Sequence, residues 1–327
     1  LGLKFGIWFE PEMISPDSDL YREHPDWTLC APGREPSFGR NQYVLDMTRK
    51  DVQDYLFGAI SAILSSANIA YVKWDFNRNL TEAASAKLPP ERRKETFHRY
   101  VLGLYSLLDR LTSAYPHVLF EGCSGGGGRF DPAMLYYSPQ IWTSDDTDAM
   151  ERCRIQYGTS FVYPPSSISA HVSAVPNHQT GRVTSFETRG NVAMAGAFGY
   201  ELDLTKLTAE EKDLVKKQVA QYHAYAPLVQ GGDFYRLLSP FENENRCAWM
   251  SVSPDKSEAL VTFIVPKTRV NFNSYLRLEG LDPKKKYLDE SAGRILSGDT
   301  LMNAGLNLSR NYRDGESVLI HLKEVKA

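Results

Sequence analysis

Hydrophobic positions over the first 225 residues follow two alternating patterns. Short apolar runs of strand length are separated by longer segments in which apolar residues recur at helical spacing. This alternation is typical of βα units arranged around a parallel sheet. The predicted strands are Lys4–Glu10, Ala70–Asn77, His117–Cys123, Gln140–Asp145, Val172–Asn177 and Ala197–Leu202, and the predicted helices are Asp51–Ser66, Glu91–Ala114, Asp148–Phe161, Phe186–Met194 and Thr208–Ala224.

The pattern changes after about Gly232. Short alternating segments separated by Gly, Pro, Asp and Asn predict a small antiparallel β domain. Six βα units precede it, and eight would close a barrel. We therefore predict a (β/α)8 TIM barrel lacking its first two βα units over residues 1–230, followed by a small antiparallel β-sandwich domain over residues 233–327. Its expected strands are Arg246–Val252, Glu258–Pro266, Tyr275–Leu278, Tyr287–Leu288 and Ser317–Lys323.

Composition narrows the class of protein. Hydrophobic residues make up 42% of the chain and charged residues 24%, which is usual for a globular protein. The net charge of −3 argues against nucleic acid as a partner, and no apolar run is long enough to predict a membrane span. The four cysteines are widely spaced without a Cys-x-x-Cys motif, which favours a reducing, cytoplasmic location.

The segment Lys73-Trp74-Asp75-Phe76-Asn77 carries the strongest chemical signal. Strand alternation places Lys73, Asp75 and Asn77 on one face and Trp74 and Phe76 on the other. Charged groups are costly in a core strand unless they are paired or belong to a site. Asp75 is either a structural partner of Lys73 or a nucleophile kept ionised by that lysine, and the surrounding residues favour the nucleophile.

A second acidic run, Asp145-Asp146-Thr147-Asp148, follows another predicted strand. Asp148 is expected to cap the next helix. Asp145 is the best candidate for an acid that transfers protons, and Trp142 could desolvate it. A Mg²⁺ or Ca²⁺ site is the alternative, but no other strand supplies obvious ligands, so we expect no metal and no cofactor.

A glycine-rich loop, Ser124–Gly128, follows the predicted strand that ends at Cys123. The loop lacks the Gly-Lys-Ser/Thr of a phosphate-binding P-loop, so close approach of the backbone to a ligand is the preferred interpretation, with a plain turn as the alternative. Cys123 has no evident His partner and is expected to shape a pocket wall or fill the core.

Two further residues are ambiguous from the sequence alone. Trp8, at the end of the first predicted strand, could stack on the apolar face of a sugar or pack in the core. Arg40 lies in a polar loop, where a surface charge is the ordinary expectation. The seven histidines form no zinc-binding motif.

Four segments together resemble glycoside hydrolase family 36, the bacterial α-galactosidases, in the order found in that family. They are Trp8-Phe9-Glu10-Pro11-Glu12-Met13, Lys73-Trp74-Asp75-Phe76-Asn77, Glu121-Gly122-Cys123-Ser124-Gly125-Gly126-Gly127-Gly128-Arg129-Phe130-Asp131 and Trp142-Thr143-Ser144-Asp145-Asp146-Thr147-Asp148-Ala149. The resemblance runs through the whole chain, including the β domain.

The resemblance implies a retaining exo-glycosidase that hydrolyses terminal α-galactosides such as melibiose and raffinose. Asp75 matches the nucleophile and Asp145 the acid/base, and retaining enzymes hold these carboxyls about 5–5.5 Å apart. The positions implied to bind substrate are Trp8, Arg40, Lys73, Trp74, Phe76, Asn77, Cys123, Gly125, Gly126 and Trp142.

The chain departs from the family at its front. It begins within a predicted core strand without an initiator Met, so we expect a fragment whose activity in isolation is impaired. The parent protein is expected to be a homo-oligomer, by resemblance a tetramer. Rival functions are galactosyl transfer of the raffinose-synthase type, α-N-acetylgalactosaminidase activity, non-catalytic carbohydrate binding and a metal-dependent hydrolase.

Overall fold

The computed structural model describes residues 2–82, 84–269 and 274–326, which divide into two compact units, 1–142 and 143–327. The first unit is built on parallel strands that neighbour one another in the order β1, β4, β5, β6. Parallel strands need crossover connections, and helices supply them here. Their bounds are β1 Phe5–Phe9, β4 Ile69–Asp75, β5 Leu119–Cys123, β6 Gln140–Trp142, α2 Lys50–Ser66, α3 Thr96–Ala114 and α4 Pro132–Tyr137.

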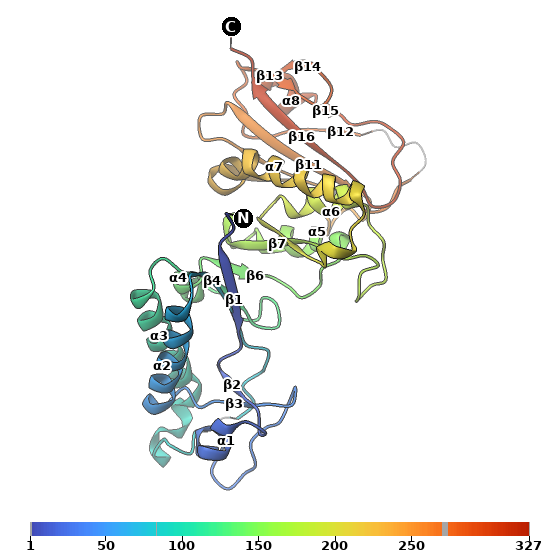
Figure 1. Cartoon of the computed structure of the whole chain (residues 1–327). Helices are drawn as coiled ribbons and strands as arrows, with labels where there is room; N and C mark the ends of the chain where they lie inside the picture. Colours follow the sequence, from blue (N-terminus) through green and yellow to red (C-terminus); the bar gives the residue numbers. More distant parts are fainter. Residues whose placement is uncertain (1, 83, 270–273, 327) are drawn as a thin grey trace. The chain divides into compact units, whose positions relative to one another are not determined.

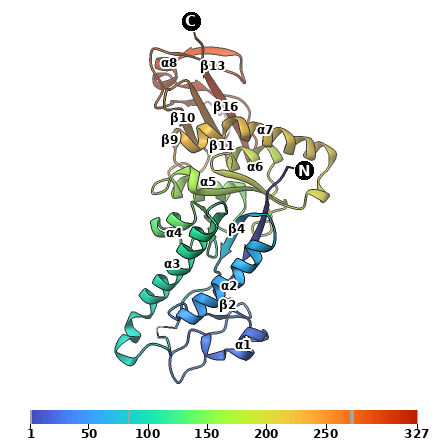
Figure 2. The ribbon, with the colours of Figure 1, turned by 60° about the vertical axis from the view of Figure 1, so that its left-hand side comes forward.

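Helices α2 and α3 lie side by side in both ribbon views (Figures 1 and 2). Apolar residues at helical spacing on α2, among them Val52, Leu56 and Ile60, are buried with Val72 and Trp74 of β4. A polar segment between β1 and α2 holds only short elements. These are β2 Met13–Ile14, α1 Asp19–Glu23, β3 Tyr43–Val44 and the 3₁₀ turn Pro25–Trp27; the turn Pro90–Glu95 precedes α3.

The second unit continues the βα alternation and ends in an antiparallel sheet. Strands β7 and β8 are parallel neighbours. The capping box at Thr208 and Glu211 opens α7 as predicted. The elements are α5 Ala149–Thr159, β7 Ile168–Ser173, α6 Phe186–Ala193, β8 Ala197–Glu201 and α7 Ala209–Gly231, with 3₁₀ turns at Pro165–Ser167 and Leu204–Lys206.

The antiparallel sheet has the strand order β14-β13-β16-β11-β10-β9. One face encloses its own core around Met250, Phe263 and Tyr287, while Trp249 and Ile264 pack with Cys153 and Tyr157 of α5. Figure 1 shows α6 and α7 beside β11 and β16. The remaining bounds are β9 Asp233–Leu238, β10 Cys247–Val252, β11 Glu258–Val265, β12 Tyr275–Leu276, β13 Lys286–Asp289, β14 Arg294–Ser297, α8 Gly298–Asn303, β15 Leu306–Asn307 and β16 Glu316–Glu324.

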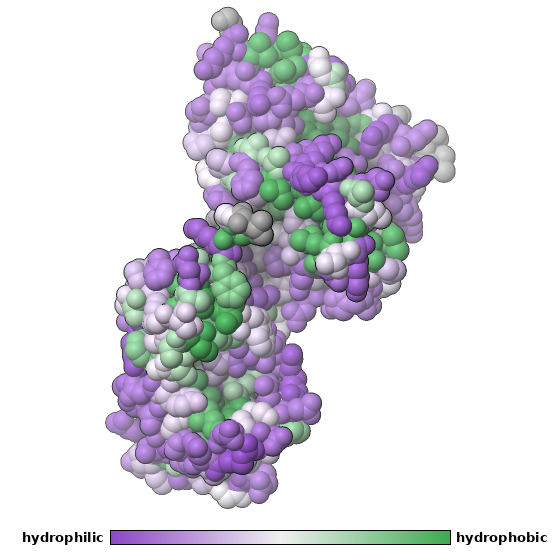
Figure 3. Space-filling view, in the orientation of Figure 1, coloured by the Kyte–Doolittle hydropathy of each residue, from purple (hydrophilic) through white to green (hydrophobic). Residues whose placement is uncertain are grey.

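The surface is mixed rather than uniformly polar. The space-filling view shows hydrophilic residues over most of the visible face and apolar surface over β1 in the first unit (Figure 3). Phe5 and Trp8 of this strand are 58% and 51% exposed. Among the described residues, no helix combines the length and the apolar character needed to cross a membrane.

Several predicted boundaries shift in the structure. Strand β4 ends at Asp75, so Phe76 and Asn77 follow the strand, and β6 ends at Trp142, so Asp145 lies in a loop. Strand β7 starts four residues earlier than predicted and leaves Asn177 beyond its end. Each of these candidate site residues therefore lies in the loop that follows a strand, where the backbone conformation is set by the loop.

Candidate active site

Asp75 is the last residue of β4, and its side chain is buried. Its Oδ2 accepts two hydrogen bonds, from Trp8 Nε1 at 3.2 Å and from Asn77 Nδ2 at 2.8 Å. One carboxylate oxygen is thus anchored, while the other, Oδ1, is buried beside the Cys123 thiol and accepts no hydrogen bond from the residues that the structure describes. A carboxylate held in one orientation suits a nucleophile.

Asn77 joins three segments through one amide. Its Nδ2 donates to Glu10 Oε1 and to Asp75 Oδ2, each at 2.8 Å. Its Oδ1 accepts from the Gly125 N–H at 3.0 Å. Since the amino group faces carboxylates and the carbonyl faces an N–H, the orientation of this amide is fixed by its partners.

The glycine-rich loop requires glycine for conformational reasons. Gly125 and Gly126 have φ of +56° and +80°, in the left-handed region that disfavours other residues. The loop closes through a hydrogen bond from the Ser124 N–H to the Gly126 carbonyl at 2.8 Å. Gly125 is exposed, so the absence of a side chain there leaves its backbone accessible beside Asn77, whereas Gly126 is buried.

Cys123 is buried and pairs in register with Asp75 across β4 and β5. Burial, together with the nearby Asp75 carboxylate, raises the pKa of its thiol to about 12. The thiol is therefore protonated at neutral pH and a poor nucleophile. Its expected role in a pocket wall stays a prediction.

Lys73 differs from the simplest expectation from the sequence. Its ammonium lies 3.5 Å from Glu121 Oε1 rather than forming its ion pair with Asp75, and it lies over the Trp142 ring at 5.2 Å from the centroid. Glu121 is fully buried and also accepts hydrogen bonds from Tyr71 and from Gln140. Burial and this carboxylate raise the pKa of Tyr71.

Trp74 and Phe76 are buried beneath the strand end, at 0% and 4% exposure. The Trp74 indole donates to Glu12 Oε1 at 2.8 Å, and Phe76 lies under the Arg129 guanidinium at 4.8 Å. Both side chains pack in the core. Their expected contact with substrate stays a prediction. Trp142 is likewise buried.

Sequence reasoning missed the buried group that supports this strand end. Glu12 is fully buried and accepts from Trp74, from the Tyr100 hydroxyl at 2.8 Å and from the Arg129 guanidinium at 3.1 and 2.9 Å. The only sequence signal was a second carboxylate two residues after Glu10. Burial, with the Glu12 carboxylate, raises the pKa of Tyr100.

Arg40 is exposed, with φ of +53° in a tight turn closed by Gly39 and Gln42. Arg78, which the sequence did not single out, holds this loop. Its guanidinium donates to the carbonyl oxygens of Gly39 at 3.0 Å, Gln42 at 2.6 Å and Ser37 at 2.9 Å. The shape of the Arg40 loop is therefore set by a residue that directly follows Asn77.

In the second unit, Asp145 is exposed in the loop between β6 and α5. Asp148 caps α5 through the Met150 N–H at 2.9 Å, as predicted. Among the described residues, no group of three or more His, Cys, Asp or Glu side chains is placed to hold a metal ion. This acidic run consists of the buried cap Asp148, the exposed carboxylate of Asp145 and the half-buried carboxylate of Asp146, which accepts from the Asp148 N–H.

In the first unit, a carboxylate at the end of a parallel strand lies beside a half-exposed tryptophan and a glycine loop, at the strand end where β/α-barrel enzymes place their catalytic groups. The melibiase family model matches residues 1–232, and the model of the glycosyl hydrolase family 36 C-terminal domain matches residues 246–322. The chain belongs to glycoside hydrolase family 36.

Individual relatives agree with this assignment. The chain is 60% identical over its whole length to the α-galactosidase AgaA of Geobacillus stearothermophilus and 50% identical over 99% of its length to the α-galactosidase Mel36A of Lactobacillus acidophilus. It spans 45% and 44% of these proteins, which is less than half of each.

Solved structures support the fold. The chain matches the crystal structure of AgaA with a TM-score of 0.96, covering 99% of this chain and 45% of that one. An AgaA variant solved in complex with raffinose matches with a TM-score of 0.97. The predicted fold class, an incomplete parallel (β/α)8 barrel followed by an antiparallel β domain, is confirmed. The predicted boundary between residues 230 and 233 stays a prediction.

Proposed function

We propose that the protein is a retaining α-galactosidase that removes terminal α-linked galactose from oligosaccharides of the melibiose and raffinose type. In this mechanism Asp75 attacks the anomeric carbon while the bond to the leaving oxygen breaks, and Asp145 protonates that oxygen. Asp145 then takes a proton from water, whose oxygen displaces Asp75 and returns the α configuration.

The observation that carries this proposal is the asymmetric setting of Asp75. Trp8 and Asn77 fix one oxygen, and the other accepts no hydrogen bond from the described residues. A nucleophile needs a free lone pair directed at the substrate and a carboxylate that does not rotate. Family membership and the raffinose complex of a relative 59% identical to the chain support galactosides as the substrate class.

The side chains around Asp75 receive roles under this proposal. Trp8 offers a half-exposed indole to the sugar ring, and the Gly125–Gly126 backbone offers a close approach. Lys73, Arg40 and Asn77 supply polar contacts. Cys123 and Trp142 shape the wall, and Trp74 and Phe76 act by packing under the strand.

The test uses the full-length protein with raffinose as substrate. Asp75→Gly is expected to lower kcat by more than ~1,000-fold. Azide should then restore turnover of an activated aryl α-galactoside and give the β-galactosyl azide, because one displacement inverts the anomeric centre. The exposed Asp213→Asn on α7 is the matched control and should leave turnover unchanged.

Three results would contradict the proposal: full activity of Asp75→Gly, a first-formed galactose of β configuration in the wild type, or no turnover of any α-galactoside. Galactosyl products at high acceptor concentration would instead identify a transferase. Preference for an N-acetylgalactosaminide would identify the other rival activity.

We also propose a cytoplasmic location and a homo-oligomeric, tetrameric assembly for the full-length protein. Four free cysteines, three of them buried, support a reducing compartment. Light scattering of the full-length protein tests the assembly, and a monomer would contradict it.

A further inference from the structure

The loop that carries Asp145 is folded on itself by local hydrogen bonds. Ser144 Oγ accepts from the Asp146 N–H at 3.1 Å, and Asp146 Oδ1 accepts from the Asp148 N–H at 3.0 Å. On the N-terminal side, the buried Arg152 donates to the Ser144 carbonyl at 3.1 Å. The residue before Asp145 is thus attached to the body of α5.

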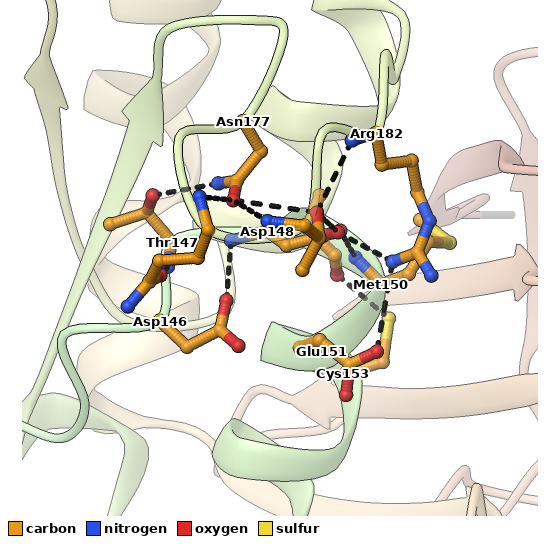
Figure 4. Close-up of polar contacts among 11 residues, drawn as sticks. Asp146, Thr147, Asp148, Met150, Glu151, Cys153, Asn177 and Arg182 are labelled. Carbon is orange, nitrogen blue, oxygen red and sulfur yellow. Dashed lines mark hydrogen bonds and ion pairs between the residues drawn. The ribbon is translucent and has the colours of Figure 1, made fainter.

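A second segment, residues 177–182, holds the C-terminal side of the same loop (Figure 4). Asn177 Nδ2 donates to Thr147 Oγ1 at 2.9 Å, and Gln179 Oε1 accepts from the Thr147 N–H at 3.3 Å. Asn177 is itself ordered, since its Oδ1 accepts from the N–H groups of Gln179 at 2.9 Å and Thr180 at 3.0 Å.

Asp148 is the point at which this segment and α5 meet. Its side chain is buried, and its Oδ1 caps α5. Its Oδ2 accepts from the Thr180 hydroxyl and from Arg182 Nη1, the latter at 2.6 Å. Arg182 also forms an ion pair with Glu151 at 3.7 Å, and both side chains are labelled in Figure 4. A buried carboxylate with this set of donors has one orientation, and the loop that ends in it has one path.

We propose that Arg182 and Thr180 are positioning residues that act through Asp148 to hold the Asp145 carboxyl where it can protonate the leaving oxygen. This inference rests on the proposed function, in which Asp145 is the acid/base. The loop is held at Ser144 on one side and at Thr147 and Asp148 on the other. Release of either side displaces the loop and the Asp145 carboxyl that it carries, and displacement of a catalytic group by about 1 Å costs ~100-fold in rate.

Leaving-group dependence separates a misplaced acid from a damaged fold. A sugar alkoxide departs only when its oxygen receives the proton of Asp145, whereas dinitrophenolate departs as the stable anion without that proton. For both substrates kcat/KM reports the same first step, the attack of Asp75 with cleavage of the glycosidic bond. The ratio of the two values, measured on one preparation, does not depend on how much of the protein is folded.

The experiment measures this ratio for raffinose and 2,4-dinitrophenyl α-galactoside on the full-length protein. Arg182→Met is expected to lower kcat/KM for raffinose by ~10- to 100-fold, part of the ~10²–10⁴-fold that general acid catalysis supplies, with less than ~3-fold loss on the aryl substrate. Thr180→Val should act in the same direction but less. Arg182→Lys, which retains a cation for Asp148, should restore most of the raffinose activity.

Arg154→Met is the matched control. Arg154 lies on α5 and lines the same cleft of about 470 Å³ as Arg182, but it contacts Phe241 and the Pro240 carbonyl instead of the Asp145 loop. Its substrate ratio should equal that of the wild type. A changed ratio in this variant would show that loss of any arginine at the cleft has the effect, and the positioning role would fall.

Asp145→Ala distinguishes the failure of this inference from the failure of the proposed function. If Asp145→Ala lowers the two kcat/KM values equally or not at all, Asp145 is not the acid and the proposed function is wrong. If Asp145→Ala discriminates between the substrates while Arg182→Met and Thr180→Val do not, the proposed function stands and the positioning role is overturned.

Discussion

At the scale of single residues, the buried Glu12 carboxylate fixes the end of β4. It accepts hydrogen bonds from Trp74, Tyr100 and Arg129 while its own exposure is 0%. A buried ion pair is of little net value against an apolar replacement, but removal of one partner leaves the other uncompensated. The side chain is therefore sensitive to loss of charge even where shape is kept.

Glu12→Gln tests this dependence. The amide keeps the shape of the side chain, but Arg129 loses its charged partner, so the free energy of unfolding should fall by about 2–3 kcal/mol. Urea denaturation of the full-length protein measures the change. Glu35→Gln, at an exposed loop position, should stay within ~0.5 kcal/mol of the wild type, and an equally small change for Glu12→Gln would contradict the prediction.

The sequence was enough to predict that Asp75 and Asn77 lie on one side, because strand alternation is a local property. The two side chains still meet although β4 ends at Asp75, before Asn77. Glu12 and Arg129 were beyond its reach, since the two residues are 117 positions apart and meet only through tertiary packing. The partner of Lys73 was also missed, because Glu121 arrives from the neighbouring strand β5. The local sequence pattern was therefore sufficient to locate Asp75 and Asn77, whereas the ion pairs that support them form between residues distant in the sequence.

At the scale of elements, two glycines in helices α2 and α3 should respond to substitution in opposite ways. A Cβ at Gly103 of α3 would lie 1.8 Å from the Met47 carbonyl oxygen, whereas a Cβ at Gly58 of α2 would meet nothing within 4 Å. The close approach of α3 to the chain before α2 therefore requires glycine at position 103 only.

Gly103→Ala should lower the free energy of unfolding by about 3 kcal/mol through overpacking. Gly58→Ala should raise it by ~0.5–1 kcal/mol, because alanine favours the helix and reduces the entropy of the unfolded chain. Thermal and urea unfolding of both variants give the comparison. Stabilisation by Gly103→Ala would show that the two segments are further apart than described.

The start of α5 supplies a prediction about pH. Burial disfavours ionisation of Asp148, but hydrogen bonds from Thr180 and Arg182 outweigh it and hold the pKa of Asp148 below its usual value. A depressed pKa means that the carboxylate stabilises the folded state above the unfolded pKa of ~3.9 and that this contribution is lost as pH falls through the folded pKa.

Asp148→Asn isolates the charge, because asparagine caps helices about as well as aspartate. At pH 7 the variant should be less stable by about 2 kcal/mol, and the difference should narrow as pH falls below ~4. Urea unfolding at pH 7 and pH 3.5 measures it. A difference that is constant with pH would mean that the ion pair with Arg182 is not the cause.

At the scale of the whole molecule, the antiparallel sheet uses both faces. One face encloses the core around Phe263 and Tyr287, and the other packs Trp249 and Ile264 against α5. The Ser317 hydroxyl, on β16, also accepts from Asn191 and donates to Thr188, each at 2.9 Å. The predicted domain boundary near residue 233 therefore passes through a packed interface within the second unit.

Residues 233–327 expressed alone should consequently be aggregation-prone and bind a hydrophobic dye, because the Trp249 face loses its cover. Residues 143–327, which keep that cover, should bind less dye per molecule. Size-exclusion chromatography and dye fluorescence make the comparison. A monomeric, cooperatively unfolding 233–327 would mean that the β domain is independent of α5 to α7.

The single amide of Asn77, bonded at once to Glu10, Asp75 and Gly125, has a thermodynamic consequence. A ligand that displaces the glycine loop must also disturb the hydrogen bond from Asn77 that orients the Asp75 carboxylate. The affinity for a ligand at the glycine loop and the orientation of the Asp75 carboxylate are then thermodynamically coupled. By reciprocity, the free energy by which binding at the loop favours one orientation equals the free energy by which that orientation favours binding.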